Sequence, residues 1–187
     1  MSTRSVPDVA PVLARGGLVG VAAWLLGYLV TYLLHSGNVR DALGTAILEF
    51  LAGDPVTWKL IGWLYFNAHF VDASVPGLFG SSTTNLLSGA EEATLLVLYV
   101  LPPLVLVAVG AFVARGTTET AEAAKEGAAV TAGYLPASLV AAFAVRISVG
   151  DAVAGPVFVT AVLLAGLVYP LVFGVVGGVA TAVVSGE

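Results

Sequence analysis

Four long stretches of the chain contain no charged side chain. No Asp, Glu, Lys or Arg occurs in residues 16–34, 93–114, 127–145 or 152–186. Since a helix that crosses a bilayer needs about 20 mostly apolar residues, each stretch is long enough to be one. The pattern predicts an all-α fold, an integral membrane helical bundle. Its four transmembrane helices are expected over about 16–34, 93–114, 127–145 and 154–184.

The remaining chain organises around these spans. Residues 1–15 form a short polar N-terminal tail, and residues 16–187 form a single transmembrane helical domain. After the first span, apolar residues recur at helical spacing from Leu43 to Leu51, with Thr45 and Glu49 on the opposite face. This pattern predicts an amphipathic helix that lies in the membrane interface.

Residues 56–72, VTWKLIGWLYFNAHFVD, are the most distinctive part of the chain. At about 1.5 Å rise per residue a helix of this length is short for a hydrocarbon core of about 30 Å. It also carries Lys59 near its start and two polar residues near its end. We therefore predict a re-entrant or surface-lying helix that completes an interfacial hairpin over 39–71. A fifth span remains the alternative.

Polar and aromatic side chains of this segment form the candidate site. On a helix Trp58, Tyr65, His69 and Asp72 share one face, and Asn67 lies on a neighbouring stripe. Tyr65 and His69 are expected to touch, and His69 and Asp72 are expected to pair. The five residues are a candidate ligand or partner surface. The alternative interpretation is that they anchor or pack the helix at the membrane edge.

Glycine and proline spacing points to how the helices pack. Gly16, Gly20 and Gly27 share a face of the first span, and Gly174 and Gly178 have GxxxG spacing in the last. Such small residues allow close helix packing, within the bundle or against a partner.

A further pattern is that a tyrosine shortly precedes a proline in each of the later spans: Tyr99/Pro102, Tyr134/Pro136 and Tyr169/Pro170. Proline kinks a helix and frees a carbonyl that can line a polar path. Proline is also simply common in membrane helices, so both interpretations stay open.

Composition excludes several classes of protein. Only 10% of the residues are charged, against about 25% in an average soluble domain, and the net charge is −5. The chain has no cysteine and only two histidines, His35 and His69, without metal-ligand spacing. We therefore expect no metal, no cofactor and, because basic residues are few, no nucleic-acid partner. The expected spans contain no Asp or Glu, so we predict no catalytic residues and no enzyme.

Three segments together carry a family resemblance: GGLVGVAAWLLGYLVTYLL, WKLIGWLYFNAHFVD and YVLPPLVLVAVGAF. They resemble an uncharacterised multi-pass membrane protein family of halophilic archaea, a domain of unknown function. The low lysine content and acidic charge balance agree with such a source. The resemblance implies a location in the cell membrane and transfers no functional residue.

The function predicted from the sequence is that of a non-enzymatic membrane subunit or scaffold. Its partners would be the lipid bilayer and other membrane proteins or a second copy of itself. The alternative is a small passive channel or solute-binding membrane protein that uses the proline-kinked helices and the Tyr65/His69 region.

Overall fold

The computed structural model describes residues 10–77, 80–88 and 93–186, and most of them are helical. The first half contains α1 (Ala10–Asp41), α2 (Leu43–Ala52), α3 (Thr57–Asn67), β1 (Ala73–Gly77) and β2 (Gly80–Thr84). Next come α4 (Ala93–Leu96), the 3₁₀ helix η1 (Val97–Tyr99), α5 (Leu101–Val113), α6 (Thr120–Ala128) and α7 (Thr131–Ala144). The chain ends with β3 (Ile147–Val149), β4 (Ala152–Pro156), α8 (Phe158–Thr160), the π-helix η2 (Ala161–Val168) and α9 (Tyr169–Ser185).

Three continuous helices are long and apolar enough to cross a membrane: Ala10–Asp41, Thr120–Ala144 and Phe158–Ser185. They correspond to the first, third and fourth predicted spans. The second, 93–114, differs because it is broken into α4, η1 and α5, and its continuous apolar part is Val97–Val113. Pro102 and Pro103 lie in the first turn of α5, where an N–H group has no partner within the helix and its absence costs nothing. In the middle of one continuous helix the same prolines would remove backbone hydrogen bonds.

A small antiparallel sheet corrects the all-α prediction. Its strand order is β2-β1-β4-β3, and β1 joins the two hairpins by pairing with β4. Each strand has three to five residues, and none shows a clear alternation of apolar and polar positions. Because β1 and β4 lie far apart in the sequence, their pairing leaves no local signal. The strand β4 also delays the last helix, which begins at Phe158 instead of the predicted 154.

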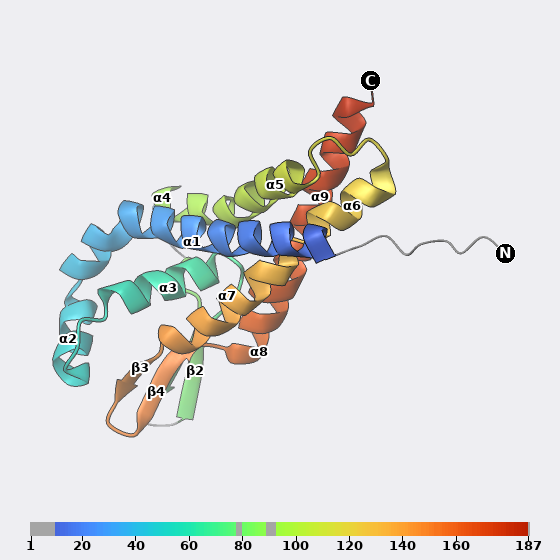
Figure 1. Cartoon of the computed structure of the whole chain (residues 1–187). Coiled ribbons are helices and arrows are strands. Elements are labelled where there is room, and N and C mark those ends of the chain that lie inside the picture. Colours follow the sequence, from blue (N-terminus) through green and yellow to red (C-terminus); the bar gives the residue numbers. More distant parts are fainter. Residues whose placement is uncertain (1–9, 78–79, 89–92, 187) are drawn as a thin grey trace.

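The sheet lies at one end of the helical bundle. Figure 1 shows α2, the strands and α8 at this end, with α6 and the C-terminus away from it. Within the bundle α1 packs on α7 and α3, while α5 and α6 pack on α9. The β1–β2 hairpin and the loop between α5 and α6 are therefore at opposite ends of the molecule.

The helix α3 runs into the bundle and is almost completely buried. Every residue of α3 except Trp58 and Lys59 is buried, and the following strand β1 leads the chain back to the sheet. The helix α3 therefore lies inside the bundle and not on its surface. Tyr65, Asn67 and His69 are 0% exposed, so of the two structural roles considered for them, packing inside the bundle fits and a position on the surface does not.

The predicted amphipathic helix is present as α2, and its apolar side faces outward. Leu43 and Phe50 are 78% and 86% exposed, whereas Thr45 is buried. On the inner side Glu49 accepts a hydrogen bond from the Val56 amide, and so supports the start of α3. A helix that turns its polar side toward the protein and its apolar side outward suits an apolar surrounding.

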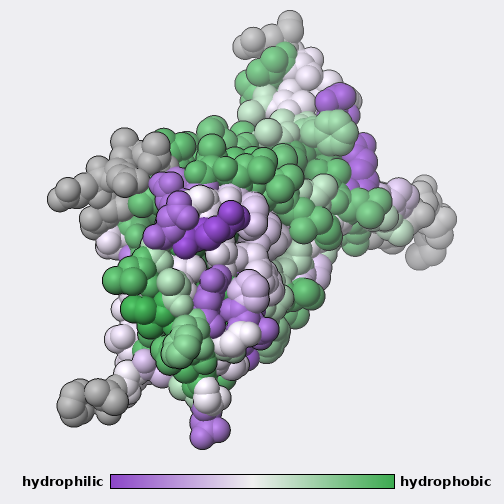
Figure 2. All heavy atoms as spheres, turned by 90° about the vertical axis from the view of Figure 1, so that its left-hand side faces the viewer, coloured by the Kyte–Doolittle hydropathy of each residue, from purple (hydrophilic) through white to green (hydrophobic). Residues whose placement is uncertain are grey.

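Much of the outer surface is apolar in the same way. Figure 2 shows hydrophobic residues over large parts of one face, around a central group of hydrophilic ones. Side chains such as Leu18 and Leu33 on α1, Val184 on α9 and Leu104 on α5 are more than 60% exposed. Contiguous exposed apolar surface of this kind marks contact with lipid or with another protein.

Two of the long helices also begin earlier in the chain than the sequence predicted. The polar tail was predicted over 1–15; residues 1–9 lie outside the described residues, but α1 already begins at Ala10. Arg15 is therefore helical, and its guanidinium donates hydrogen bonds to the carbonyls of Phe112 and Val113 at the end of α5. The tail's second half is thus part of the bundle.

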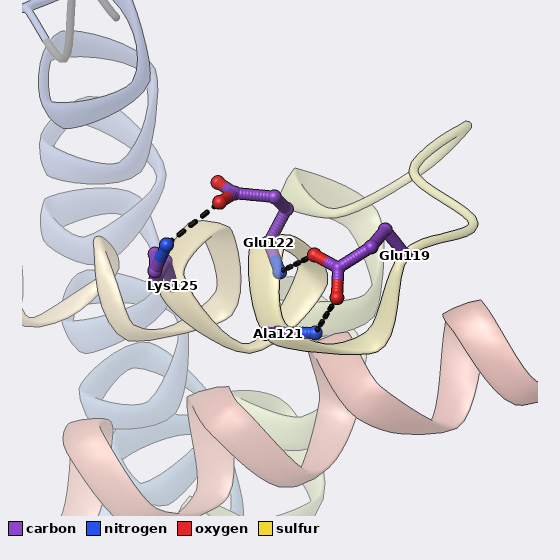
Figure 3. A network of polar contacts seen from close by, with 4 residues as sticks. All are labelled: Glu119, Ala121, Glu122 and Lys125. Atoms are coloured by element: carbon purple, nitrogen blue, oxygen red, sulfur yellow. Dashed lines mark hydrogen bonds and ion pairs between the residues drawn. The ribbon is translucent and has the colours of Figure 1, made fainter. Parts of the chain in front are cut away.

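The helix of the third predicted span likewise begins at Thr120 rather than near 127, because a carboxylate caps it. The Glu119 side chain accepts hydrogen bonds from the amides of Ala121 at 3.1 Å and Glu122 at 2.7 Å (Figure 3). Lys125 forms an ion pair with Glu122 one turn later, at 2.6 Å. A carboxylate at a helix start satisfies free amides and opposes the helix dipole, so the polar stretch extends the apolar helix.

All five glycines of the predicted packing faces lie against other helices of the same chain. A Cβ atom at each would meet backbone or side-chain atoms of a neighbour. The neighbours are Ala129 for Gly16, Val130 for Gly20, Tyr65 for Gly27, Gly127 for Gly174 and Ala123 for Gly178. These contacts bring helix axes close together inside the bundle, with backbone against backbone.

We expect Gly20→Ala to destabilise the protein by about 1–3 kcal/mol, because the added methyl group overlaps the Val130 carbonyl oxygen and the Tyr134 amide. Gly37→Ala is the matched control: it lies in the same helix α1 and has no atom within 4 Å of the added Cβ. The measurement is thermal unfolding in detergent, followed by size-exclusion chromatography. Equal melting temperatures for the two variants would contradict this account of the packing.

Candidate functional site

Three buried polar side chains meet in the core of the bundle. Tyr65 comes from α3, His69 from the turn after it and Tyr134 from α7, and each is 0% exposed. We call these three residues the Tyr–His cluster. The glycine face of α1 leaves room for this cluster, because any side chain at Gly27 would have a Cβ atom that overlaps the Tyr65 hydroxyl.

The Tyr134 hydroxyl connects the cluster. It lies 2.8 Å from the Tyr65 hydroxyl and 2.8 Å from His69 Nε2. The other imidazole nitrogen, His69 Nδ1, lies 2.8 Å from the backbone carbonyl oxygen of Tyr65. The hydrogen bonds therefore lead from the Tyr65 hydroxyl through Tyr134 and His69 back to the Tyr65 carbonyl oxygen. They join α3 to α7.

The direction of each hydrogen bond follows from simple chemistry. A carbonyl oxygen only accepts, so His69 Nδ1 must carry the proton and donate to it. Burial lowers the pKa of the His69 imidazole to about 4, so at neutral pH Nε2 is an acceptor. Tyr134 then donates to Nε2, and Tyr65 donates to the Tyr134 oxygen. Every proton of the cluster has one acceptor.

Aromatic rings surround the cluster. The Trp24 ring meets Tyr65 edge-on at 5.3 Å between ring centres, and Tyr169 contacts His69 at 4.9 Å. Tyr99 stacks on Phe70 at 4.7 Å. The tyrosines of the three predicted Tyr–Pro pairs thus all contact either the His69–Phe70 turn or, through Tyr134, the cluster itself. The three tyrosines that precede a proline in the sequence therefore lie close to the same turn in the structure.

The turn itself is held by Asn67. Its side-chain nitrogen donates to the Val71 carbonyl at 2.7 Å, and its side-chain oxygen accepts the Leu86 amide at 2.8 Å. Phe70 adopts a φ of 57°, a left-handed conformation that is rare for a residue with a bulky side chain. Asn67 therefore satisfies non-helical backbone that would be costly to bury without partners.

The other two predicted site residues lie elsewhere. Trp58 is 40% exposed at the start of α3, with the Lys59 ammonium 5.6 Å from its ring centre. Asp72 follows the turn, and the predicted pair with His69 is wrong because both imidazole nitrogens bind other atoms. The expected contact of Tyr65 with His69 is present, with ring centres 4.9 Å apart.

Sequence reasoning did not assign Tyr134, Tyr169, Trp24 or Asn85 to the site. Asn85 accepts from the Tyr99 hydroxyl at 3.3 Å and donates to the Asn67 carbonyl at 3.4 Å. The available signal was the Tyr–Pro recurrence, which marked two of these four residues without showing what they contact. In the part of the chain that is described, no group of three or more His, Asp or Glu residues is placed to hold a metal ion.

The arrangement defines a class of protein: a mainly helical bundle with three helices long and apolar enough to span a membrane, a buried short helix and a small sheet. Residues 1–185 match the model of a family of unknown function (DUF7978), and the chain belongs to this family. A search of curated proteins and a search of solved structures each gave no match. The predicted membership of a family without assigned activity is confirmed.

We expect Tyr134→Phe to destabilise the protein by roughly 2–4 kcal/mol, because it leaves the Tyr65 hydroxyl and His69 Nε2 buried without partners. Tyr32→Phe is the matched control, since no hydrogen bond of the Tyr32 hydroxyl is found within residues 10–77, 80–88 and 93–186. Denaturant or thermal unfolding in detergent measures both. A Tyr134→Phe variant as stable as the control would show that the cluster contributes nothing to stability.

Proposed function

We propose that the chain is a multi-pass protein of the cell membrane that acts as a non-enzymatic subunit or scaffold. The closed hydrogen bonding of the Tyr–His cluster is the observation that carries this proposal. The Tyr–His cluster uses all of its side-chain donors in hydrogen bonds within the protein, which supports rigidity rather than chemistry on a bound molecule.

Several features support a membrane location with four crossings. The three long apolar helices have the length required, and the second predicted span contains the shorter apolar helix Val97–Val113. The exposed surface of α1, α5 and α9 is rich in large apolar residues. The scarcity of lysine and the acidic net charge support a halophilic archaeal source.

The passive channel or solute-binding protein is the second candidate. An open, apolar cavity of 460 Å³ between α1 and α7 favours it, with Trp24, Pro136 and Trp58 among its lining residues. Neither Tyr65 nor His69 lines that cavity, and both are fully buried. A route for a polar solute through the Tyr65/His69 region would require the bundle to open, so we rank this candidate lower.

The four-crossing topology predicts that the β1–β2 hairpin and the α5–α6 loop lie on opposite sides of the membrane. The chain has no cysteine, so Ser82→Cys and Thr118→Cys, at two exposed positions, give clean single-site probes. We expect a membrane-impermeant maleimide to label only one of them in intact cells and both in lysed cells. Labelling of both in intact cells would overturn the topology.

A rigid subunit or scaffold should add no permeability to a vesicle. We expect proteoliposomes holding the full chain to show the same glycerol and ion flux as empty ones, and mass analysis after mild extraction to find the chain in a complex of fixed stoichiometry. Flux that His69→Ala abolishes, from a chain that purifies alone, would establish the second candidate instead. Leu104→Ala serves as the control for indirect effects on flux, because Leu104 is exposed on α5 and lies outside both the cluster and the 460 Å³ cavity.

A further inference from the structure

One arginine at the sheet end of the bundle is held against aromatic rings and has no anionic partner among residues 10–77, 80–88 and 93–186. Arg146 directly follows α7, and its guanidinium carbon lies 4.4 Å from the Phe143 ring centre and 6.0 Å from that of Phe158. Among the described residues the only ion pair is Lys125 with Glu122, and the Arg146 guanidinium donates to none of them. Its five N–H groups are therefore available to an external acceptor.

The same arginine lines a cavity together with hydroxyl groups. The cavity has a volume of 490 Å³, and Ser74 and Thr83 contribute to its lining. Ser74 pairs with Thr83 across β1 and β2 and with Gly155 on β4, so these residues share one face of the sheet. At Gly155 a Cβ would lie 3.1 Å from Arg146 Cγ, so the glycine leaves room for the arginine stem over this face.

Beside Arg146, the cavity has a helix start in its wall, which adds positive potential, and exposed apolar side chains around it. The long helix Phe158–Ser185 begins at its wall, where Val157 and Phe158 are lining residues, and the free amides of a helix start favour an anion. Val153, also in the lining, and Phe143, beneath the guanidinium, are each 51% exposed. An anion bound here would sit next to exposed apolar side chains.

We propose that this cavity binds the phosphate of an anionic membrane phospholipid, with Arg146 as the main contact and Ser74 and Thr83 as hydrogen-bond donors. A guanidinium and hydroxyls are suited to phosphate oxygens. The lipid, rather than free phosphate, is favoured because the cavity lies where two long apolar helices end and the border would accept acyl chains. The proposal rests on the membrane location proposed above.

The test compares two lipids with the same acyl chains, of which only one carries a phosphate in its headgroup. The full chain in detergent is titrated with dioleoyl-phosphatidylglycerol or with dioleoylglycerol, and native mass spectrometry measures the lipid-bound fraction. We expect phosphatidylglycerol to bind preferentially and Arg146→Gln to weaken that binding about tenfold. Arg115→Gln is the matched control, because Arg115 lies 4.7 Å from the Phe112 ring centre at the opposite end, outside this cavity. It should bind as the wild type does.

Ser74→Ala provides a milder variant that keeps the charge, and we expect a weakening of a few-fold. Equal binding of phosphatidylglycerol to the Arg146→Gln and Arg115→Gln variants, both folded by size-exclusion chromatography, would overturn the proposal. Competition by millimolar inorganic phosphate alone would assign the cavity to a soluble anion and overturn the lipid assignment. If the chain instead remains soluble without detergent, the membrane proposal itself fails.

Discussion

The buried helix α3 brings backbone and side-chain polar groups into an apolar bundle, and they must find partners there. In the Tyr–His cluster the Tyr134 hydroxyl satisfies both the Tyr65 hydroxyl and His69 Nε2, while the Tyr65 carbonyl satisfies Nδ1. An orphaned polar group in such an environment costs about 1–3 kcal/mol. The position of α3 against α1, and its link to Tyr134 on α7, depend on these hydrogen bonds being complete.

The close approach of the helices makes that arrangement possible. Gly20 lets α1 touch the backbone of α7 near Tyr134, and Gly27 leaves space for the Tyr65 hydroxyl. At the other side of the bundle Gly174 meets Gly127 in the same manner. Where apolar side chains face an apolar surrounding, the hydrophobic effect adds little to helix association, so close packing and buried hydrogen bonds must supply the specificity. Such a core is suited to a fixed structure.

The two ends of the bundle differ in what they offer. The core is closed, whereas the sheet end presents the outward apolar face of α2 and the cavity beside Arg146. The residues of that cavity come from β1, β2, β4 and the end of α7, which only the antiparallel pairing of β1 with β4 brings together. The sheet therefore matters more for the surface of this protein than for its core.

The sequence by itself determined the apolar helices, the packing glycines and the unusual nature of 56–72, because helical periodicity and charge-free length are local properties. It did not predict the sheet or the buried partners of His69. The pairing of β1 with β4 and the contacts of Tyr134 with Tyr65 and His69 join residues that are 65 or more positions apart along the chain. Such contacts depend on how the helices cross, and no local pattern records a crossing, so only the tertiary structure decided them.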